Sequence, residues 1–203
     1  MNTAGPLVLA SRSPRRTALL DMVGIDHVVC VPNDEEARLF APDERIAPER
    51  ARAICRSLAE AKAAEVAARL PEREVLAADT IVVVDGLCFG KPADRADARR
   101  MLRMLAGRTH QVYTGVCLRQ GEHYLSEAVA TDVTFYPWWE ELALLVDAYA
   151  ESGAPLDKAG AYGIQDAGAL LIERIEGDYY NVVGLPLSAF WRLRRQFWRT
   201  IGT

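Results

Sequence analysis

The segment Val75–Val84 is the strongest strand signal in the chain and the feature that most constrains its fold. It is rich in valine, which favours strands, and it is almost uniformly apolar. Asp85-Gly86 follows directly, and this dipeptide is typical of a two-residue hairpin turn. The segment therefore predicts a core strand that leads into a hairpin.

Helix and strand signals alternate along the rest of the chain without an internal repeat. Ser13 and Pro14 suit the N-cap and the first position of a helix, and Gly24 suits its end. We further expect strands over 7–10, 111–119 and 123–135, helices over 48–70, 94–107, 139–150 and 187–198, and a hairpin of strands 170–175 and 179–183. This mixed order predicts an α/β fold with a mixed twisted sheet flanked by helices.

The composition limits the classes of function. A hydrophobic content of 50% with 26% charged residues argues against a disordered chain, and 203 residues suit a single domain over 1–203. The net charge of -4 gives no general attraction to nucleic acid or to an anionic membrane, so a phosphate site must be a local positive cluster. The cysteines form no CxxC pair, and we see neither a signal peptide nor a run of ~18 apolar residues. We therefore expect a cytoplasmic protein without a membrane or nucleic-acid partner.

The first cluster that could carry chemistry is SRSPRR, residues 11–16, between a predicted strand and a predicted helix. Free backbone N–H groups and the positive end of the helix dipole favour an anion at such a junction. Arg15 and Arg16 oppose that dipole, and a bound polyphosphate would relieve the conflict because arginine grips phosphate oxygens through two parallel bonds. The competing interpretation is that these arginines are simply solvated.

The second candidate is Asp79-Thr80, which interrupts the apolar run of the predicted core strand. Asp79 shares a strand face with Ile81 and Val83, which we expect in the core. A carboxylate in that position must be paired, bound to a metal, or exposed at a sheet edge. We favour a catalytic aspartate over a structural one whose hydrogen bonds are satisfied.

Three further segments carry polar residues whose individual signals are weak. Lys91 lies in a Gly-Lys-Pro turn, which is not a Walker A motif. An acidic run over 34–36 lies in a long polar loop and Lys62 lies on the next predicted helix, and solvated surface is the simpler interpretation of both. The segment 157–165 is rich in small residues that let the backbone approach a ligand, and Gln165 can both donate and accept toward a base edge.

Together these segments resemble the Maf family, which includes bacterial septum-formation-inhibitor-like proteins. The resemblance extends from Leu7 to about Leu187 and consists of seven pieces in order: LASRSPRR, LAEAKA, AADTIVVVDG, GKP, HQVYTGV, DKAGAYGIQ and GDYYNVVGLPL. It implies a fold similar to that of the inosine triphosphatases, with two lobes around a cleft, and often a homodimer. It also implies hydrolysis of a nucleoside triphosphate to the monophosphate and pyrophosphate with a divalent metal, usually Mg²⁺ or Mn²⁺.

Carried over by position, the resemblance implies roles for individual residues. Asp79 matches the proton acceptor, and Glu36 and Asp79 are the expected metal-binding carboxylates. The assignment of Glu36 assumes no gap between Gly24 and the acidic loop. The phosphates are expected against the 11–16 loop. The other positions that match the family's active site or are expected to contact substrate are Ser11, Ser13, Arg15, Arg16, Lys62, Thr80, Lys91 and Gln165.

The resemblance also bears on specificity. Arg15, Thr80 and Gln165 follow the members that act on dTTP and UTP, so we expect a pyrimidine substrate, including modified forms. Members that act on 7-methyl-GTP carry an aromatic residue in place of the first arginine, SDQ instead of ADT, and a glutamate near the glutamine. Arg12 and Asp166 depart from the common pattern, and a negative charge at 166 bears on substrate preference more than on reaction type.

Two other functions stay open. The chain could be a 7-methyl-GTP pyrophosphatase of the same fold, which the residues at the three specificity positions oppose. It could also be a regulatory cell-division binding module without relevant catalysis, which its intact set of charged residues opposes.

Overall fold

The computed structural model describes residues 5–33, 41 and 44–200. These residues form a seven-stranded sheet in the order β2-β1-β3-β5-β6-β7, and β4 pairs with β3 outside this path. β1 is parallel to β2 and β3, whereas β3–β4, β3–β5, β5–β6 and β6–β7 are antiparallel. The predicted α/β fold with a mixed sheet is confirmed.

The elements follow the predicted order closely. The strands are β1 Leu7–Leu9, β2 His27–Val29, β3 Val75–Val84, β4 Leu87–Phe89, β5 Thr109–Gln120, β6 His123–Phe135 and β7 Ile172–Glu176. The α-helices are α1 Pro14–Met22, α2 Pro48–Arg69, α3 Arg95–Leu105, α4 Glu140–Glu151, α5 Tyr179–Val183 and α6 Leu187–Thr200. Three short 3₁₀ helices are η1 Ala154–Asp157, η2 Ala159–Ala161 and η3 Ala167–Leu171.

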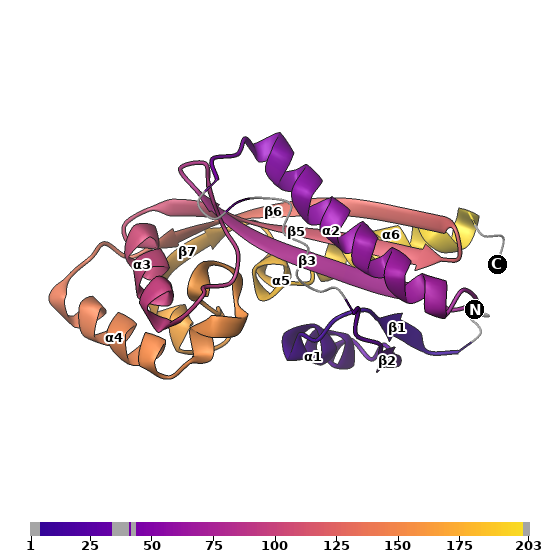
Figure 1. The fold of residues 1–203 in the computed structure, drawn as a ribbon, viewed down its shortest axis with the longest axis horizontal. Coiled ribbons are helices and arrows are strands. Elements are labelled where there is room, and N and C mark those ends of the chain that lie inside the picture. Colours follow the sequence, from indigo (N-terminus) through magenta and orange to yellow (C-terminus); the bar gives the residue numbers. More distant parts are fainter. Residues whose placement is uncertain (1–4, 34–40, 42–43, 201–203) are drawn as a thin grey trace.

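Helices cover both faces of the sheet, and the molecule is elongated (Figure 1). α2 runs along one face, where its small buried side chains such as Ala59 and Ala63 pack with Cys117 of β5. On the opposite face, the buried side of α6 packs with α1 and β1 in one apolar cluster that includes Leu20 and Phe190. α3 and α4 form a second cluster at the other end of the molecule (Figure 1).

One edge of β3 is open in its middle. β1 pairs with β3 at Val75 and Leu76, and β4 pairs with it from Val82 onward. Asp79 and Thr80 lie between these two pairings, so in the described part of the chain no strand lies beside them on this edge. On the other edge they pair with β5. The polar interruption of the apolar strand therefore coincides with the gap between two neighbouring strands.

Gly115 of β5 allows α2 to approach the sheet closely. A Cβ at this position would lie 2.1 Å from the Cys55 carbonyl oxygen and 2.6 Å from the Arg56 nitrogen, which real side chains do not tolerate. Gly115 is also the register partner of Asp79. The absence of a side chain here thus sets the distance between α2 and the polar stretch of β3.

The predicted hairpin of strands 170–175 and 179–183 is wrong. β7 starts only at Ile172 and pairs with β6, and residues 179–183 form the helix α5. The aromatic and valine content of this segment favours a strand, but its ends decide the structure. The Asp178 carboxylate accepts hydrogen bonds from the Tyr180 and Asn181 N–H groups, and Gly184 ends the helix at a φ of 118°.

None of the helices in the described part of the chain is long and apolar enough to cross a membrane.

Candidate active site

A cleft opens at the uncovered edge of β3. It is lined by the loop after β1, by α1, by β3 on both of its faces, and by the segments 157–165 and 182–184. Six cationic side chains and two carboxylates line its described part: Arg12, Arg15, Arg16, Lys62, Lys91 and Lys158, against Asp79 and Asp157. This local excess of four positive charges, in a chain with a net charge of -4, suits a ligand with several anionic oxygens.

Arg16 is the most firmly placed of these cations. It lies in the first turn of α1, and only 9% of its surface is exposed. Its Nε donates to the Gly184 carbonyl at 2.8 Å, Nη1 to Ser11 Oγ at 2.9 Å and Nη2 to Thr80 Oγ1 at 3.3 Å. The planar guanidinium is therefore fixed by acceptors from three parts of the chain before any ligand binds.

Asp79 and Lys62 form a short ion pair at the open edge of β3. Lys62 comes from α2, and both side chains are mostly buried, with 12% and 17% exposure. Asp79 points to the α2 face, whereas Thr80 points to the opposite face because side chains alternate along a strand. The cleft therefore receives a paired carboxylate from one face of β3 and a hydroxyl from the other.

The Thr80 hydroxyl is part of a buried hydrogen-bond chain. Its Oγ1 lies 2.9 Å from Oγ1 of Thr114, which is fully buried on the neighbouring strand β5. Thr114 in turn donates to the Asn181 carbonyl oxygen at 3.1 Å. Asn181 is anchored to the sheet, because its side-chain amide donates to the Val112 carbonyl and to Thr131 Oγ1. The polar side of the cleft floor is thus tied to α5.

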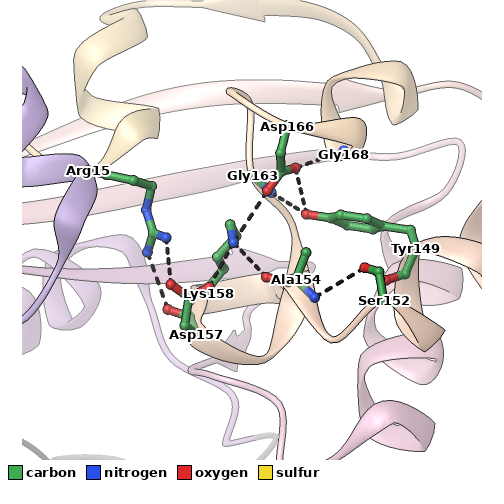
Figure 2. Close-up of polar contacts among 9 residues, drawn as sticks. All are labelled: Arg15, Tyr149, Ser152, Ala154, Asp157, Lys158, Gly163, Asp166 and Gly168. Atoms are coloured by element: carbon green, nitrogen blue, oxygen red, sulfur yellow. Dashed lines mark hydrogen bonds and ion pairs between the residues drawn. The ribbon is translucent and has the colours of Figure 1, made fainter.

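Arg15 reaches across the cleft to Asp157 (Figure 2). Nη1 donates to the Asp157 carboxylate at 2.7 Å and Nη2 to its carbonyl oxygen at 3.3 Å. Lys158 Nζ contacts the other carboxylate oxygen at 2.7 Å. Burial alone would raise the pKa of Asp157, but the hydrogen bonds from Lys158 and Arg15 outweigh it and lower the pKa. Asp157 is therefore a carboxylate that holds two cations in place.

Asp166 is not among the residues that line the cleft, and its carboxylate belongs to the same network (Figure 2). Its Oδ1 accepts from Tyr149 Oη at 2.7 Å and from the Gly168 N–H at 2.9 Å, and Oδ2 lies 3.3 Å from Lys158 Nζ. The Tyr149 hydroxyl also accepts from the Gly163 N–H at 3.0 Å. The negative charge at this position thus braces the turn that carries Gln165 and is balanced by Lys158.

The structure brings together every predicted site residue that it describes. All of the following line the cleft: Ser11, Ser13, Arg15, Arg16, Lys62, Asp79, Thr80, Lys91 and Gln165. Lys91 and Gln165 are exposed at its rim. Glu36 lies outside the described residues. The roles of all these residues in catalysis and binding stay predictions.

Sequence reasoning missed two groups of residues. Asp157 and Lys158 open a segment that was singled out for its small residues, but the pairing of Asp157 with Arg15 spans 142 positions and leaves no local signal. Thr114 and Asn181 are not among the predicted site residues. Polar residues within apolar or aromatic runs, as in HQVYTGV and DYYNVV, are the signal that could have pointed to them.

The donor set in the cleft can be compared with the needs of a divalent metal. Mg²⁺ at phosphate sites is usually held by one or two carboxylates together with phosphate oxygens. Asp79 supplies one carboxylate, and Asp157 is already engaged by two cations. The described residues contain no group of three or more His, Cys, Asp or Glu side chains suited to a metal. Asp79 therefore fits a metal held jointly with a polyphosphate, and not a cage made by these residues alone.

Comparisons with known proteins find a family model and named relatives that match this chain. A family described as "Maf-like protein" matches residues 6–197. The dTTP/UTP pyrophosphatase of Symbiobacterium thermophilum is 50% identical over 94% of this chain and 93% of its own. The dTTP/UTP pyrophosphatase of Bacillus velezensis is 42% identical over 94% of this chain and 96% of its own. A solved HAM1 protein from Coxiella burnetii aligns with a TM-score of 0.40 at 14% identity, over 81% of this chain and 90% of that one.

Proposed function

This chain belongs to the Maf-like protein family, and we propose that it is, as a single domain over 1–203, a nucleoside triphosphate pyrophosphatase that hydrolyses dTTP and UTP. Two relatives that are 50% and 42% identical over nearly their full lengths carry this activity in their names. The observation that carries the proposal is a cleft with a clear excess of positive charge and one paired carboxylate at an open strand edge.

The proposed reaction is attack of water at the α-phosphorus, which yields the monophosphate and pyrophosphate. The phosphates lie against the loop from Ser11 to Arg16, where Arg16 is pre-oriented. Arg16, Lys62 and Lys91 offset the charge that builds on the leaving pyrophosphate. Asp79 takes a proton from the attacking water, and the ion pair with Lys62 fixes the direction of its carboxylate.

A divalent cation is part of this proposal. Mg²⁺ or Mn²⁺ held by Asp79 and Glu36 would stabilise charge on the phosphate oxygens when bound. The chain's own contribution is to present Asp79 in a cleft that Arg16, Lys62 and Lys91 also line. Specificity is assigned to Arg15, Thr80 and Gln165, because polar groups that pair with one base disfavour a base that leaves them unpaired.

The test is pyrophosphate release from dTTP, UTP, CTP, GTP, ATP and 7-methyl-GTP with each metal, beside the variant Asp79→Asn. We expect fast release from dTTP and UTP, and a loss of about 100-fold or more in the variant because its amide cannot take the proton. Asp85→Asn is the matched control: it makes the same change in charge on the same hairpin, where Asp85 pairs with Arg108 away from the cleft.

Each contrary result has its own meaning. Release from 7-methyl-GTP alone would keep the mechanism and overturn the specificity. No release from any nucleotide would overturn the proposed enzymatic activity and favour a regulatory binding module. An Asp79→Asn variant with wild-type turnover would remove Asp79 from the role of base.

A further inference from the structure

We propose that Thr114, through the Asn181 carbonyl, fixes the Thr80 hydroxyl as a hydrogen-bond acceptor toward the cleft and so selects the N3–H group of thymine or uracil. The inference rests on the proposed function and adds to it a residue outside the cleft lining. Thr114 is a positioning residue, since it acts only through Thr80.

The hydroxyl hydrogen of Thr114 has one possible acceptor. Its hydroxyl carries one hydrogen and lies near two oxygens, Thr80 Oγ1 at 2.9 Å and the Asn181 carbonyl at 3.1 Å. A carbonyl oxygen can only accept, so the Thr114 hydrogen must go to Asn181. Thr114 is fully buried, and no water competes for that hydrogen.

The direction of the Thr80 hydroxyl hydrogen follows from that of Thr114. Because Thr114 has given its hydrogen to Asn181, the bond between the two threonines can form only if Thr80 donates. The hydrogen of Thr80 is then directed away from the cleft, into the sheet. Arg16 Nη2, which can only donate, approaches the same oxygen at 3.3 Å and agrees with this direction. All three contacts have one consistent solution.

The third step concerns the substrate. A hydroxyl oxygen has two lone pairs, and Arg16 takes one of them, which leaves one for a group in the cleft. That group must be a donor. Uracil and thymine carry a hydrogen on N3, whereas N3 of cytosine is an acceptor that would face the Thr80 lone pair. The fixed direction therefore favours UTP and dTTP and opposes CTP.

The orientation depends on the rigidity of Asn181. Its side-chain amide donates to the Val112 carbonyl at 2.8 Å and to Thr131 Oγ1 at 3.0 Å, and the residue is fully buried. Its carbonyl also accepts the Gly184 N–H at the end of α5. The acceptor that sets the direction thus cannot turn away.

The experiment compares kcat/KM for UTP and CTP in the wild type and in Thr114→Val, which keeps the shape and removes the hydroxyl. The Thr80 hydrogen is then free to turn toward the cleft. We expect the UTP-to-CTP ratio to fall by about tenfold, through KM more than kcat, because the base lies away from the reacting phosphorus. Binding of α,β-methylene UTP and α,β-methylene CTP should show the same change.

Two variants serve as controls. Thr114→Ser restores a hydroxyl and should keep the ratio within about twofold of the wild type. Thr109 lies on β5, the strand of Thr114, and its Oγ1 is 2.9 Å from Oγ1 of Thr134 on β6; Thr109→Val removes this exposed contact and should leave the ratio unchanged. Thr114→Ala serves as a second deletion if Thr114→Val folds poorly, which thermal unfolding reports.

The outcomes separate the inference from the proposed function. If the wild type releases no pyrophosphate from UTP or dTTP, both fail. If it prefers UTP and both deletion variants keep that preference, or lose both substrates equally, the inference alone is overturned. A falling ratio that Thr114→Ser restores supports it.

Discussion

Arg16 shows how a single residue can be prepared for an anion by its neighbours. A long arginine side chain has many rotamers, and three acceptors, the nearby Ser11 and the distant Thr80 and Gly184, select one of them. Gly184 contributes through its backbone carbonyl, which its left-handed φ of 118° at the end of α5 helps to aim. Binding a phosphate then requires little further ordering of this side chain.

Arg16→Lys should show that the shape of the guanidinium matters as well as its charge. A lysine keeps the charge but cannot bond three acceptors at fixed angles. We expect kcat/KM for dTTP to fall by roughly 100-fold, as measured by pyrophosphate release. Arg192→Lys on α6, an exposed residue paired with Glu127, should have no effect, and equal losses in both variants would contradict the argument.

At the residue scale, the sequence indicates Arg16 but neither its partner Gly184 nor the partner of Thr114. SRSPRR marked Arg16 because a basic cluster at a helix start is unusual on electrostatic grounds. Its partner Gly184 lies 168 positions away, and no local pattern links the two. The partner of Thr114 is hidden for a similar reason: its place in a mostly apolar run indicates a buried polar residue, but no local pattern indicates that its hydroxyl meets Thr80.

At the scale of elements, the contact between α2 and β5 decides the geometry of the ion pair. α2 lies directly on the sheet where Gly115 has no side chain, and Lys62 is two helical turns further along the same helix. Gly115 and Asp79 are register partners on neighbouring strands. Helix and strand are thus brought together at the point where Lys62 must reach Asp79.

Gly115→Ala should displace α2. The new methyl group would lie 2.1 Å from the Cys55 carbonyl oxygen, so the helix must move outward. We expect the free energy of unfolding in urea to fall by about 1–3 kcal/mol, and kcat/KM to fall by about tenfold as Lys62 leaves Asp79. Ser126→Ala removes a contact of β6 with Glu60 of α2 without adding volume, and it should keep near-normal activity. An active, stable Gly115→Ala variant would contradict this account.

Most helices and strands could be predicted from the sequence, and the segment 179–183 is the exception. Val75–Val84 was assigned with its observed bounds because composition and turn agree there. In residues 179–183 they disagree: tyrosine and valine favour a strand, while Asp178 and Gly184 favour a short helix. The caps prevailed because Asn181 gains three buried polar contacts as a helix residue. Composition alone does not report those contacts.

At the scale of the whole molecule, His110 links stability to pH. It is fully buried between Phe135 and Tyr162, and its Nε2 lies 2.8 Å from the Tyr162 hydroxyl. Burial lowers its pKa from 6.5 to about 3. Between these two pH values the unfolded chain binds a proton at His110 that the folded chain excludes. The free energy of unfolding is therefore unaffected by this residue above pH 6.5 and falls as the pH drops below 6.5.

The prediction is a difference in slope. Between pH 7.5 and pH 5, the free energy of unfolding of the wild type should fall by about 2 kcal/mol more than that of His110→Gln, which has no imidazole but keeps a partner for Tyr162. Urea titrations at both pH values measure this difference. Parallel losses in the two proteins would show that His110 does not carry the effect.

The arrangement of the whole molecule was the hardest feature to foresee. The sequence predicts a mixed sheet, but it does not predict that β3 lies between β1 and β5 or that β4 leaves part of its edge open. Strand order depends on pairings between residues far apart in the chain, which a single sequence does not reveal. The place of the cleft follows from that order, because Asp79 lies in the gap.

The bond from Arg16 to Gly184 also has a consequence during synthesis. A ribosome makes Arg16 168 residues before Gly184, at roughly 5–20 residues per second. The nascent chain therefore carries its arginines for many seconds before the carbonyl that orders Arg16 has been made. A polypeptide released early would retain the SRSPRR loop yet lack this brace, so truncated products should not consume nucleotides.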